Sequence, residues 1–303
     1  MMKRGEGHRV AIVIINWNGL EDTRRCLKSL AKVDGPPHEI ILVDNGSTDG
    51  SDVILKEEFP DAIHLRSKTN EGFTGGNNRA FRFILEEPKY DLVTMLNNDT
   101  TVEPDFLLRL VETWESDSTI CAVQPIIYYL SRKSSVWNAG GTFNAWLGIP
   151  RTKRMALDRR YKKSQWLTGC CMLFSREVLE EYGLLDDRYF AYIEDVDFSF
   201  RISEQGGKLI VDNLSKIYHV AGASSSGSTT EGNVSPKVHF LNARNRLLLI
   251  KDHCKGLSRI SAFIYQLSRS FAMVLYFLVR RRFKKAEAVI QGSFEGLGLK
   301  PIT

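Results

Sequence analysis

RVAIVIIN, at Arg9 to Asn16, is the stretch that decides the fold. Its unbroken run of β-branched and apolar residues is typical of a strand buried on both faces, as in a parallel sheet. The next segment, EDTRRCLKSLAKV at 21–33, carries apolar residues at helical spacing. The two segments together predict one strand–helix unit.

The same alternation continues to about residue 130. Strands are predicted at 39–45, 62–67, 90–99 and 120–129, and helices at 52–59, 75–87 and 104–115. Strands that alternate with helices favour an α/β fold with a mostly parallel central sheet flanked by helices. Polar clusters follow four of the strands: NWNG, DNGSTDGS, NEGFTGG and NNDTT. Because such sheets bind ligands at the carboxyl ends of their strands, we expect these loops to meet at one edge.

The second half of the chain is less regular. Residues 131–163 predict an irregular, basic connection that leaves room for short strands. A buried strand is expected at 164–175, followed by a helix that Gly183 closes. The Ser-, Gly- and Thr-rich stretch at 221–233 is expected to form a flexible loop.

YFAYIEDVDFSFR, at 189–201, places three carboxylates among aromatic and aliphatic residues. Buried carboxylates are costly unless they are paired, hydrogen-bonded or bound to a metal, so this segment is either a solvated helix start or a site. The apolar face of the following helix places Asp197 in its first turn, as a structural acid. Glu194 and Asp195 are expected to precede that helix, at the edge of a pocket.

The composition is that of an ordinary globular protein. The chain has 303 residues, 43% of them hydrophobic, and a net charge of +5, which is too small to indicate nucleic-acid binding. Five cysteines without Cys-x-x-Cys spacing indicate reduced thiols in a cytosolic protein. The first residues lack the apolar core of a signal peptide, so a cytoplasmic location is expected.

The carboxy-terminal third predicts basic helices. We expect a catalytic domain at 1–235, with a nucleotide-binding half at 8–130 and an acceptor half at 131–235, and a helical extension at 236–303. An apolar stretch at 262–279 runs into the basic RRRFKK. Two interpretations stay open: a helix that rests on an anionic membrane surface, or a helix packed on the catalytic domain.

Asp99 is the strongest candidate metal ligand. The strand before it ends in Asn97 and Asn98, and hard divalent cations prefer such oxygen ligands. His219 follows a later strand and becomes a second candidate beside Asp99, although a lone histidine is more often structural. Asp44, at the end of a strand, and the glycines at 70–78 are candidates for binding a nucleotide and its diphosphate, with ordinary turns as the alternative.

These motifs in this order resemble the nucleotide-sugar glycosyltransferases of family 2, which have the GT-A fold, and among them the rhamnosyltransferase-like branch. The resemblance runs from Val10 to Ser224. It implies a metal-dependent, inverting transfer of a sugar, rhamnose in that branch, in cell-surface polysaccharide synthesis. The donor is then a dTDP-, UDP- or GDP-sugar, and the acceptor a saccharide or a lipid-linked saccharide.

The resemblance also implies roles for individual residues. Asp195 becomes the general base, and Glu194 beside it orients the acceptor or a neighbouring group. Asp99 becomes the main ligand of Mg²⁺ or Mn²⁺, because Asn97 stands where many relatives have Asp and supplies no charge. The implied nucleotide-sugar site comprises Asn16, Asn18, Asp44, Asn45, Gly72, Gly75, Asn77, Asn97 and Asn98.

Two other functions compete with this one. Asn97 allows a catalytically silent nucleotide-binding or assembly protein with the same fold, although Asp99, Asp195 and His219 are all present. A nicotinamide dehydrogenase is disfavoured because NWNG stands where the glycine fingerprint after the first strand belongs.

Overall fold

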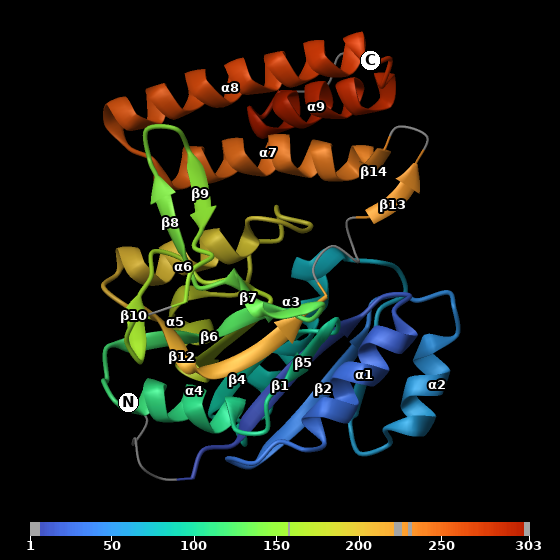
Figure 1. Cartoon of the computed structure of the whole chain (residues 1–303), viewed down its shortest axis with the longest axis vertical. Coiled ribbons are helices and arrows are strands. Elements are labelled where there is room, and N and C mark those ends of the chain that lie inside the picture. Colours follow the sequence, from blue (N-terminus) through green and yellow to red (C-terminus); the bar gives the residue numbers. More distant parts are fainter. Residues whose placement is uncertain (1–6, 157, 221–225, 230–231, 300–303) are drawn as a thin grey trace. The chain divides into compact units, whose positions relative to one another are not determined.

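The computed structural model describes residues 7–156, 158–220, 226–229 and 232–299 (Figure 1). By its contacts the chain divides into two compact units. The sheet unit comprises Met1–Thr142, Thr152–Phe190 and Glu194–Ala221. The helical unit comprises Phe143–Arg151, Ala191–Ile193 and Gly222–Thr303. Two short segments that are distant in sequence from the last helices are therefore counted with them. The predicted flexible loop falls partly on residues outside the described ranges.

The first half of the sheet is parallel, as the sequence predicts. It comprises β1 (Val10–Asn16), β2 (His38–Asp44), β3 (Ile63–Arg66) and β4 (Leu92–Asn97). These strands are hydrogen-bonded in the order β4-β1-β2-β3. β1 pairs in parallel with both β2 and β4, which explains why it is apolar on both faces.

The second half makes the sheet mixed. Its strands are β5 (Thr100–Val102), β6 (Ile120–Tyr129), β7 (Arg132–Asn138), β10 (Tyr161–Lys163), β11 (Cys171–Ser175) and β12 (Lys208–His219). β11 runs antiparallel between β4 and β6, and β12 runs parallel to β6. The irregular connection expected at 131–163 contains β7, β10 and a separate pair, β8 (Gly141–Asn144) and β9 (Ile149–Thr152).

A proline interrupts the long pair of β6 and β12. Pro125 lies opposite Asp212, and the next residue, Ile126, lies opposite Lys216, so residues 213–215 are left out of the register. A proline has no N–H to donate to the ladder, and such residues are found at irregularities of this kind. β12 thereby continues to His219 as one strand.

Helices cover both faces of the sheet. They are α1 (Leu20–Leu30), α2 (Ser51–Glu58), α3 (Gly72–Glu86), α4 (Phe106–Glu115), α5 (Arg176–Tyr182) and α6 (Glu194–Glu204). Alternate residues of β1 serve two cores: Ile12 and Ile14 pack with residues of α1 and α4, whereas Val13 packs with residues of α3 and α6. All three are fully buried, so the strand is held from both sides.

The helical unit consists mainly of α7 (Pro236–His253), α8 (Gly256–Val279) and α9 (Phe283–Gly296), which run alongside one another in Figure 1. A short hairpin, β13 (Ser226–Thr229) with β14 (Gly232–Val234), precedes them. Ser235 caps α7 through its side chain, with Pro236 at the first helical position. The Gln266 amide of α8 donates to the carbonyl of Leu147 at 2.8 Å, which ties this helix to the β8–β9 connection.

α8 is long and apolar enough, by length and composition, to cross a membrane. An 18-residue window within it has a mean hydropathy of 1.4, but only 22% of that window is buried. Seven of its exposed large apolar residues recur every three or four positions: Leu257, Ile260, Ile264, Leu267, Phe271, Leu275 and Leu278. This spacing places them on one side of the helix, and we call them the α8 stripe.

Candidate active site

The carboxyl ends of the parallel strands meet at one edge of the sheet. Asn16 of β1 lies opposite Asp44 of β2, and Ile15 lies opposite Asn97 of β4. Asp44 in turn lies opposite Arg66 of β3. The loops that follow β1, β2 and β4 therefore start side by side, which confirms the arrangement expected from the sequence.

Asn16 is the centre of a buried network. Its Nδ2 lies 3.2 Å from Asp44 Oδ1, 3.1 Å from Ser47 Oγ and 2.8 Å from Ser51 Oγ. Its Oδ1 accepts from the hydroxyl of Thr23 at 2.8 Å. The side chain is fully buried, so it orients Asp44 and the loop after β2. A direct contact of Asn16 with a nucleotide stays a prediction.

The loop after β1 presents polar and aromatic groups beside this network. Asn18 has a positive φ of 49°, and its Oδ1 accepts from the backbone N–H of Thr48 at 2.8 Å. Between the two asparagines, Trp17 is 51% exposed. Sequence reasoning passed over Trp17, although an exposed tryptophan at a sheet edge offers an aromatic face for a nucleobase to stack on. Its place inside the NWNG motif was the available signal.

Asn45 joins the loop after β2 to the start of α3. Its Oδ1 accepts from the backbone N–H of Glu71 at 3.0 Å, and its Nδ2 donates to the carbonyl of Gly72 at 2.9 Å. Asn77 lies one turn further along α3, is buried, and donates to the carbonyl of Phe73 at 2.9 Å. Both side chains therefore shape the loop, and their contact with a donor stays a prediction.

The glycines at the start of α3 allow close approach of backbone. Gly72 has a φ of 76°, and a Cβ there would lie 2.1 Å from the carbonyl oxygen of Phe190. A Cβ at Gly75 would lie 2.5 Å from the Cβ of Glu71. The backbone N–H of Thr74 donates to the same Phe190 carbonyl at 3.3 Å. The segment before α6 is thus seated on the amino end of α3, where the sequence predicts the donor diphosphate.

Asp99 and His219 face each other just beyond β4 and at the end of β12. Asp99 Oδ1 lies 3.0 Å from His219 Nε2, and both side chains are 7% exposed. Their geometry is not that of a hydrogen bond, and neither Asp99 Oδ1 nor His219 Nδ1 has a hydrogen-bond partner among the described residues. The ring of Trp137 lies against His219, with ring centroids 4.3 Å apart.

This pair fits a divalent cation. Two neighbouring ligands of an octahedral cation, each about 2.1 Å from it, lie about 3.0 Å apart. Asp99 Oδ1, which is buried without a hydrogen bond, and His219 Nε2 at 3.0 Å meet that spacing, and both are ligand types that such cations accept. Among the described residues, no third His, Cys, Asp or Glu joins the two within 4.8 Å. Positions are therefore left for oxygens of a substrate.

The two asparagines before Asp99 have other partners. Asn98 Nδ2 donates to the hydroxyl of Thr23 at 2.8 Å, which connects this loop to the Asn16 network. The backbone N–H of Asn97 donates to the carbonyl of Cys170 at 2.8 Å. These bonds fix the path of the loop after β4. Asp99 is the only charged residue of its NNDTT motif.

Glu194 and Asp195 begin α6 itself, which corrects the expectation that they precede the helix. Asp195 Oδ2 accepts from the backbone N–H of Gly169 at 3.0 Å, and its Oδ1 accepts from that of Val196 at 2.8 Å. Asp195 is half-buried and Glu194 is buried. Glu194 Oε2 has no hydrogen-bond partner among the described residues.

Burial raises the pKa of both carboxyl groups. For Glu194 the pKa is well above its usual range, because of burial and because of the neighbouring Asp195 charge. For Asp195 burial also raises the pKa, against the opposing hydrogen bonds from Gly169 and Val196. A carboxylate with a raised pKa is a stronger base, and such groups collect at functional sites.

Asp197 has a different environment. It is buried, and its Oδ2 accepts from Arg201 Nε at 2.9 Å, one turn along α6. Arg201 also donates to the carbonyl of Leu184 at 2.8 Å. A carboxylate committed to a charged partner and to the first turn of a helix is a structural acid, as the sequence predicts.

One stretch of chain, Gly169 and Cys170, links the Asp99–His219 pair to the Glu194–Asp195 pair. Gly169 holds Asp195 through its N–H, and the next residue, Cys170, accepts the N–H of Asn97, two residues before Asp99. The charges of Asp99 and Asp195 both contribute to the raised pKa of the buried Cys170 thiol, so both carboxylates lie near it. Sequence reasoning did not find this link, because TGCC reads only as part of a buried strand.

A strained turn directly precedes Glu194. Tyr192 and Ile193 have φ values of 70° and 76°, in the region that residues other than glycine rarely adopt. Within the helical unit, the fully buried Asn245 of α7 donates to the carbonyls of Ala191 at 2.9 Å and Tyr192 at 2.7 Å. These two bonds hold the turn in its conformation.

Known proteins share both the sequence pattern and the fold. A low-salt glycan biosynthesis hexosyltransferase of Haloferax volcanii is 24% identical over 95% of this chain and 91% of its own. An N-acetylglucosaminyl-diphospho-decaprenol L-rhamnosyltransferase of Mycobacterium tuberculosis is 27% identical over 69% of this chain and 75% of its own.

Among solved structures, a mannosyltransferase of Pyrobaculum calidifontis in complex with GDP-Man and Mn²⁺ superposes with a TM-score of 0.57. It covers 97% of this chain and 88% of its own at 15% identity, so it speaks for the fold alone. The profile of the family described as Glycosyl transferase family 2 matches residues 11–183, more than half of the chain. The protein is therefore a glycosyltransferase that belongs to glycosyl transferase family 2 and has the GT-A fold.

Proposed function

We propose that the protein is an inverting glycosyltransferase. It moves a hexose or a deoxyhexose such as rhamnose from a nucleotide-diphosphate donor to a hydroxyl of a saccharide or lipid-linked acceptor, in the synthesis of a cell-surface polysaccharide. The observation that carries the proposal is that Gly169 and Cys170 link the Asp99–His219 pair to Asp195. The reaction requires one locus for a cation and one for a proton, and this stretch brings the two together.

Asp195 acts as the general base. Its carboxylate accepts the proton of the acceptor hydroxyl while that oxygen forms a bond to the anomeric carbon of the donor. The bond from that carbon to the diphosphate breaks at the same time, and the electron pair leaves with the diphosphate. Attack from the face opposite the leaving group inverts the configuration. Gly169 and Val196 fix the orientation of the carboxylate through their N–H groups.

Asp99 and His219 would hold Mg²⁺ or Mn²⁺, which supplies positive charge beside the departing diphosphate when it is bound. Glu194 lies next to the base in a buried setting and orients the acceptor. Trp17, Asp44 and the loop at Asn45 serve the nucleotide: the tryptophan offers a face to the base, and the polar groups hold the ribose. A contact of Gly72 and Gly75 with the diphosphate belongs to the same proposal.

A panel of dTDP-, UDP- and GDP-sugars tests this function. We expect Mn²⁺-dependent binding of one nucleotide class and slow hydrolysis of its sugar, with inversion at the anomeric carbon seen by NMR. A donor that binds but is never hydrolysed or transferred, with any acceptor, would instead support the silent nucleotide-binding protein. Retention of configuration would rule out a single displacement with Asp195 as base.

We further propose that the helical unit brings the enzyme to an anionic membrane surface at the cytoplasmic face, where a lipid-linked acceptor is presented. Residues 236–303 contain 13 Lys and Arg against 3 Asp and Glu, whereas residues 1–235 contain 28 against 33. The α8 stripe adds apolar side chains, among them Phe271 at 66% and Ile264 at 62% exposed. An exposed apolar face on a basic unit fits a helix that lies in the interface of anionic lipids.

Two observations separate this docking from its alternatives. The opposite side of α8 is engaged within the helical unit, through buried Ala262, Gln266 and Phe277, which favours a helix that lies on a membrane over one that spans it. A second copy of the chain would bring two strongly basic units together, and like charges disfavour that pairing.

Sedimentation with vesicles tests the docking. Wild-type protein should pellet with phosphatidylglycerol vesicles and stay in solution with phosphatidylcholine vesicles. Replacing Ile264 and Phe271 together by Glu should weaken the binding by about tenfold or more, because each exposed side chain contributes about 1.5–3 kcal/mol on burial. Met155→Glu, at another residue that is 80% exposed, is the matched control. Equal pelleting of both variants, or a concentration-dependent dimer without vesicle binding, would contradict the proposal.

A further inference from the structure

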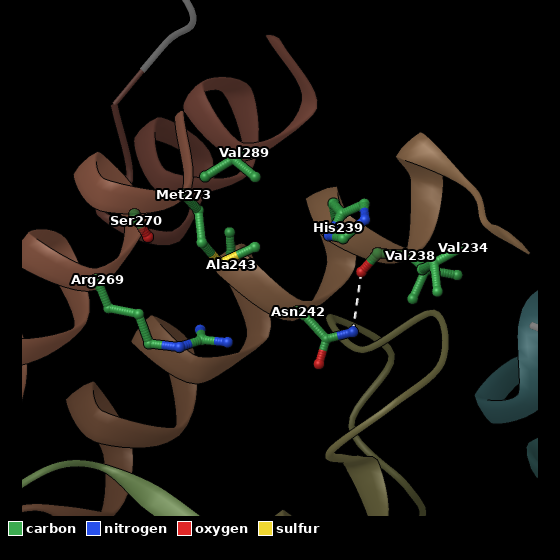
Figure 2. Close-up of a pocket in the computed structure, with 9 residues that line it drawn as sticks. All are labelled: Val234, Val238, His239, Asn242, Ala243, Arg269, Ser270, Met273 and Val289. Carbon is green, nitrogen blue, oxygen red and sulfur yellow. Dashed lines mark hydrogen bonds between the residues drawn. The ribbon is translucent and has the colours of Figure 1, made fainter. Parts of the chain in front are cut away.

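A pocket lies within the helical unit and shares no residue with the proposed reaction. It has a volume of about 230 Å³ and is formed by β14, α7, α8 and α9 (Figure 2). Its polar wall consists of His239 and Asn242 from α7 and of Arg269 and Ser270 from α8. Figure 2 shows the side chain of Arg269 extending from α8 toward Asn242 and Ala243 of α7.

The polar wall carries positive charge without a counter-ion. No carboxylate lines the pocket. Arg269 makes no hydrogen bond or ion pair with any described residue, and one turn along α7 from Asn242 the Nε of Arg246 is buried without a partner. Burial and the charge of Arg269 lower the pKa of Arg246 to about 10. Burial, followed by the charges of Lys285, Arg269 and Arg282, lowers the pKa of His239.

A partly buried charge without a counter-ion raises the free energy of the folded protein. Two such positive charges near each other, as in Arg246 and Arg269, also repel each other. None of the three acidic residues in α7, α8 and α9 lines the pocket and neutralises its positive charge. Glu287 accepts from Gln291, Glu295 pairs with Arg244, and the third, Asp252, is absent from the pocket lining. The arrangement therefore lacks an anion that would complete it.

The donors indicate which anion. A guanidinium presents parallel N–H groups that match the oxygens of a phosphate, and a hydroxyl and an amide add single hydrogen bonds. The Asn242 amide gives one N–H to the carbonyl of Val238 at 2.9 Å and keeps a second for a ligand. The remaining wall is apolar, with Val238, Met273 and Val289. A ligand that satisfies both walls has a phosphate at one end and carbon atoms at the other.

We propose that this pocket binds the phosphate group of a phosphate ester with an apolar chain, with Arg269 as its main contact. The shared chemistry is the phosphate, which a lipid headgroup or free phosphate can supply. The pocket lies in the unit that carries the α8 stripe, so a lipid phosphate is the expected source. The site stands or falls independently of Asp195, because its residues take no part in the transfer.

Calorimetric titration of the full chain with octyl phosphate, inorganic phosphate and octyl glucoside tests the proposal, each amphiphile below its micelle concentration. Octyl phosphate should bind, and it should bind more tightly than inorganic phosphate, because the apolar wall adds contacts. Equal affinity for the two phosphates would overturn the lipid source. Equal binding of the uncharged octyl glucoside would overturn the phosphate site altogether.

Arg269→Gln should weaken the binding of octyl phosphate by about tenfold or more, because it removes the charge-assisted hydrogen bonds from the guanidinium to the phosphate. Arg281→Gln removes the same charge from an exposed residue of the same unit that does not line the pocket, and it should change the affinity little. Equal losses of affinity in both variants would show a nonspecific electrostatic attraction to the basic helices, and would overturn the proposed binding site.

Thermal unfolding gives a second readout that a structural role of Arg269 would not produce. Without ligand, Arg269→Gln should unfold at the same or a higher temperature than wild type, because no ion pair is lost and charge crowding with Arg246 is relieved. With octyl phosphate, wild type should be stabilised and the variant should not. Destabilisation of the variant without ligand would show that Arg269 holds the fold, and would overturn its role as a ligand contact.

Discussion

The Asp99–His219 pair and the Glu194–Asp195 pair both bring carboxylates to one edge of the sheet, but their surroundings differ. Asp99 faces a single imidazole at 3.0 Å across a position that a cation fits. Asp195 is held by two backbone N–H groups and lies beside a buried glutamate, and burial raises its pKa. The first setting suits a carboxylate that ligates a cation, and the second suits one that gains and loses a proton. Protein surroundings thus separate two roles for one chemical group.

Asp195→Asn should cause the largest loss. It keeps the shape and the hydrogen-bonding ability of the side chain but removes the base, and general-base catalysis contributes about 10²–10⁴-fold. We expect a fall of that size in kcat with donor binding unchanged, measured by transfer assays and by nucleotide titration. In wild type the raised pKa of Asp195 places the acid limb of kcat above the ordinary range of an aspartate, and kcat falls as pH falls through it.

Asp197→Asn is the matched control for that variant. It removes a buried carboxylate two residues away that pairs with Arg201, so it should cost stability, by about 3–5 kcal/mol for a broken buried pair. The folded fraction should still transfer sugar. Comparable losses of transfer in both folded variants would erase the distinction between a catalytic and a structural acid in α6.

Asp99→Asn should cause the next largest loss, which we expect in Mn²⁺ affinity. The amide removes the only negative charge of the cation pair, so Mn²⁺ affinity in the presence of nucleotide should fall by at least about tenfold, the lower end of what even outer-shell losses cost. Calorimetry with Mn²⁺ measures it without turnover. Asp105→Asn, a nearby exposed aspartate that pairs with Arg109, should leave the affinity unchanged. An unchanged Mn²⁺ affinity of Asp99→Asn would show that the cation does not bind at the Asp99–His219 pair.

Glu194→Gln should stabilise the protein near neutral pH, because the amide removes the cost of ionising a buried carboxyl group whose pKa is raised in the folded state. The folded state binds the Glu194 proton more tightly than the unfolded state, so wild-type stability falls as pH rises from the ordinary glutamate range through the raised pKa. The variant lacks this fall. Below the ordinary range both should be equally stable in urea, and exposed Glu57→Gln should show no such pH dependence.

Asn245→Ala should cause the smallest loss. The variant removes two hydrogen bonds from the turn at Tyr192 and Ile193, so the turn relaxes and the start of α6 is less well positioned. We expect kcat to fall by about fivefold, roughly 1 kcal/mol, which is the contribution of one ordinary hydrogen bond. The KM for the donor should stay the same. Exposed Gln291→Ala is the control, and a change confined to donor KM would place Asn245 in donor binding instead.

Much of the first half could be predicted from the sequence, because its signals are local. The apolar run of β1 predicts a strand buried on both faces, and polar residues after β1, β2 and β4 mark the edge where they meet. Both depend only on periodicity and on the geometry of parallel sheets. Asp99, at the end of a strand, was found in the same way and drew attention to His219, whereas the role of Asp195 came from the resemblance to the family.

The link between the two pairs could not be predicted. Nothing in TGCC indicates that its strand, β11, inserts antiparallel between β4 and β6, because that pairing is between distant segments. The hydrogen bond from Gly169 to Asp195 depends on it. Likewise, apolar spacing alone did not reveal that α6 begins at Glu194. Its first turn is anchored by bonds that only the folded chain makes.

The position of Cys170 has a consequence for reactivity. Its thiol is buried, and burial together with the charges of Asp99 and Asp195 raises its pKa far above the ordinary value. Thiol reagents attack the thiolate, so this cysteine is inert while the site is intact. Labelling of Cys170 by a thiol reagent therefore reports local opening of the candidate active site before the whole chain unfolds.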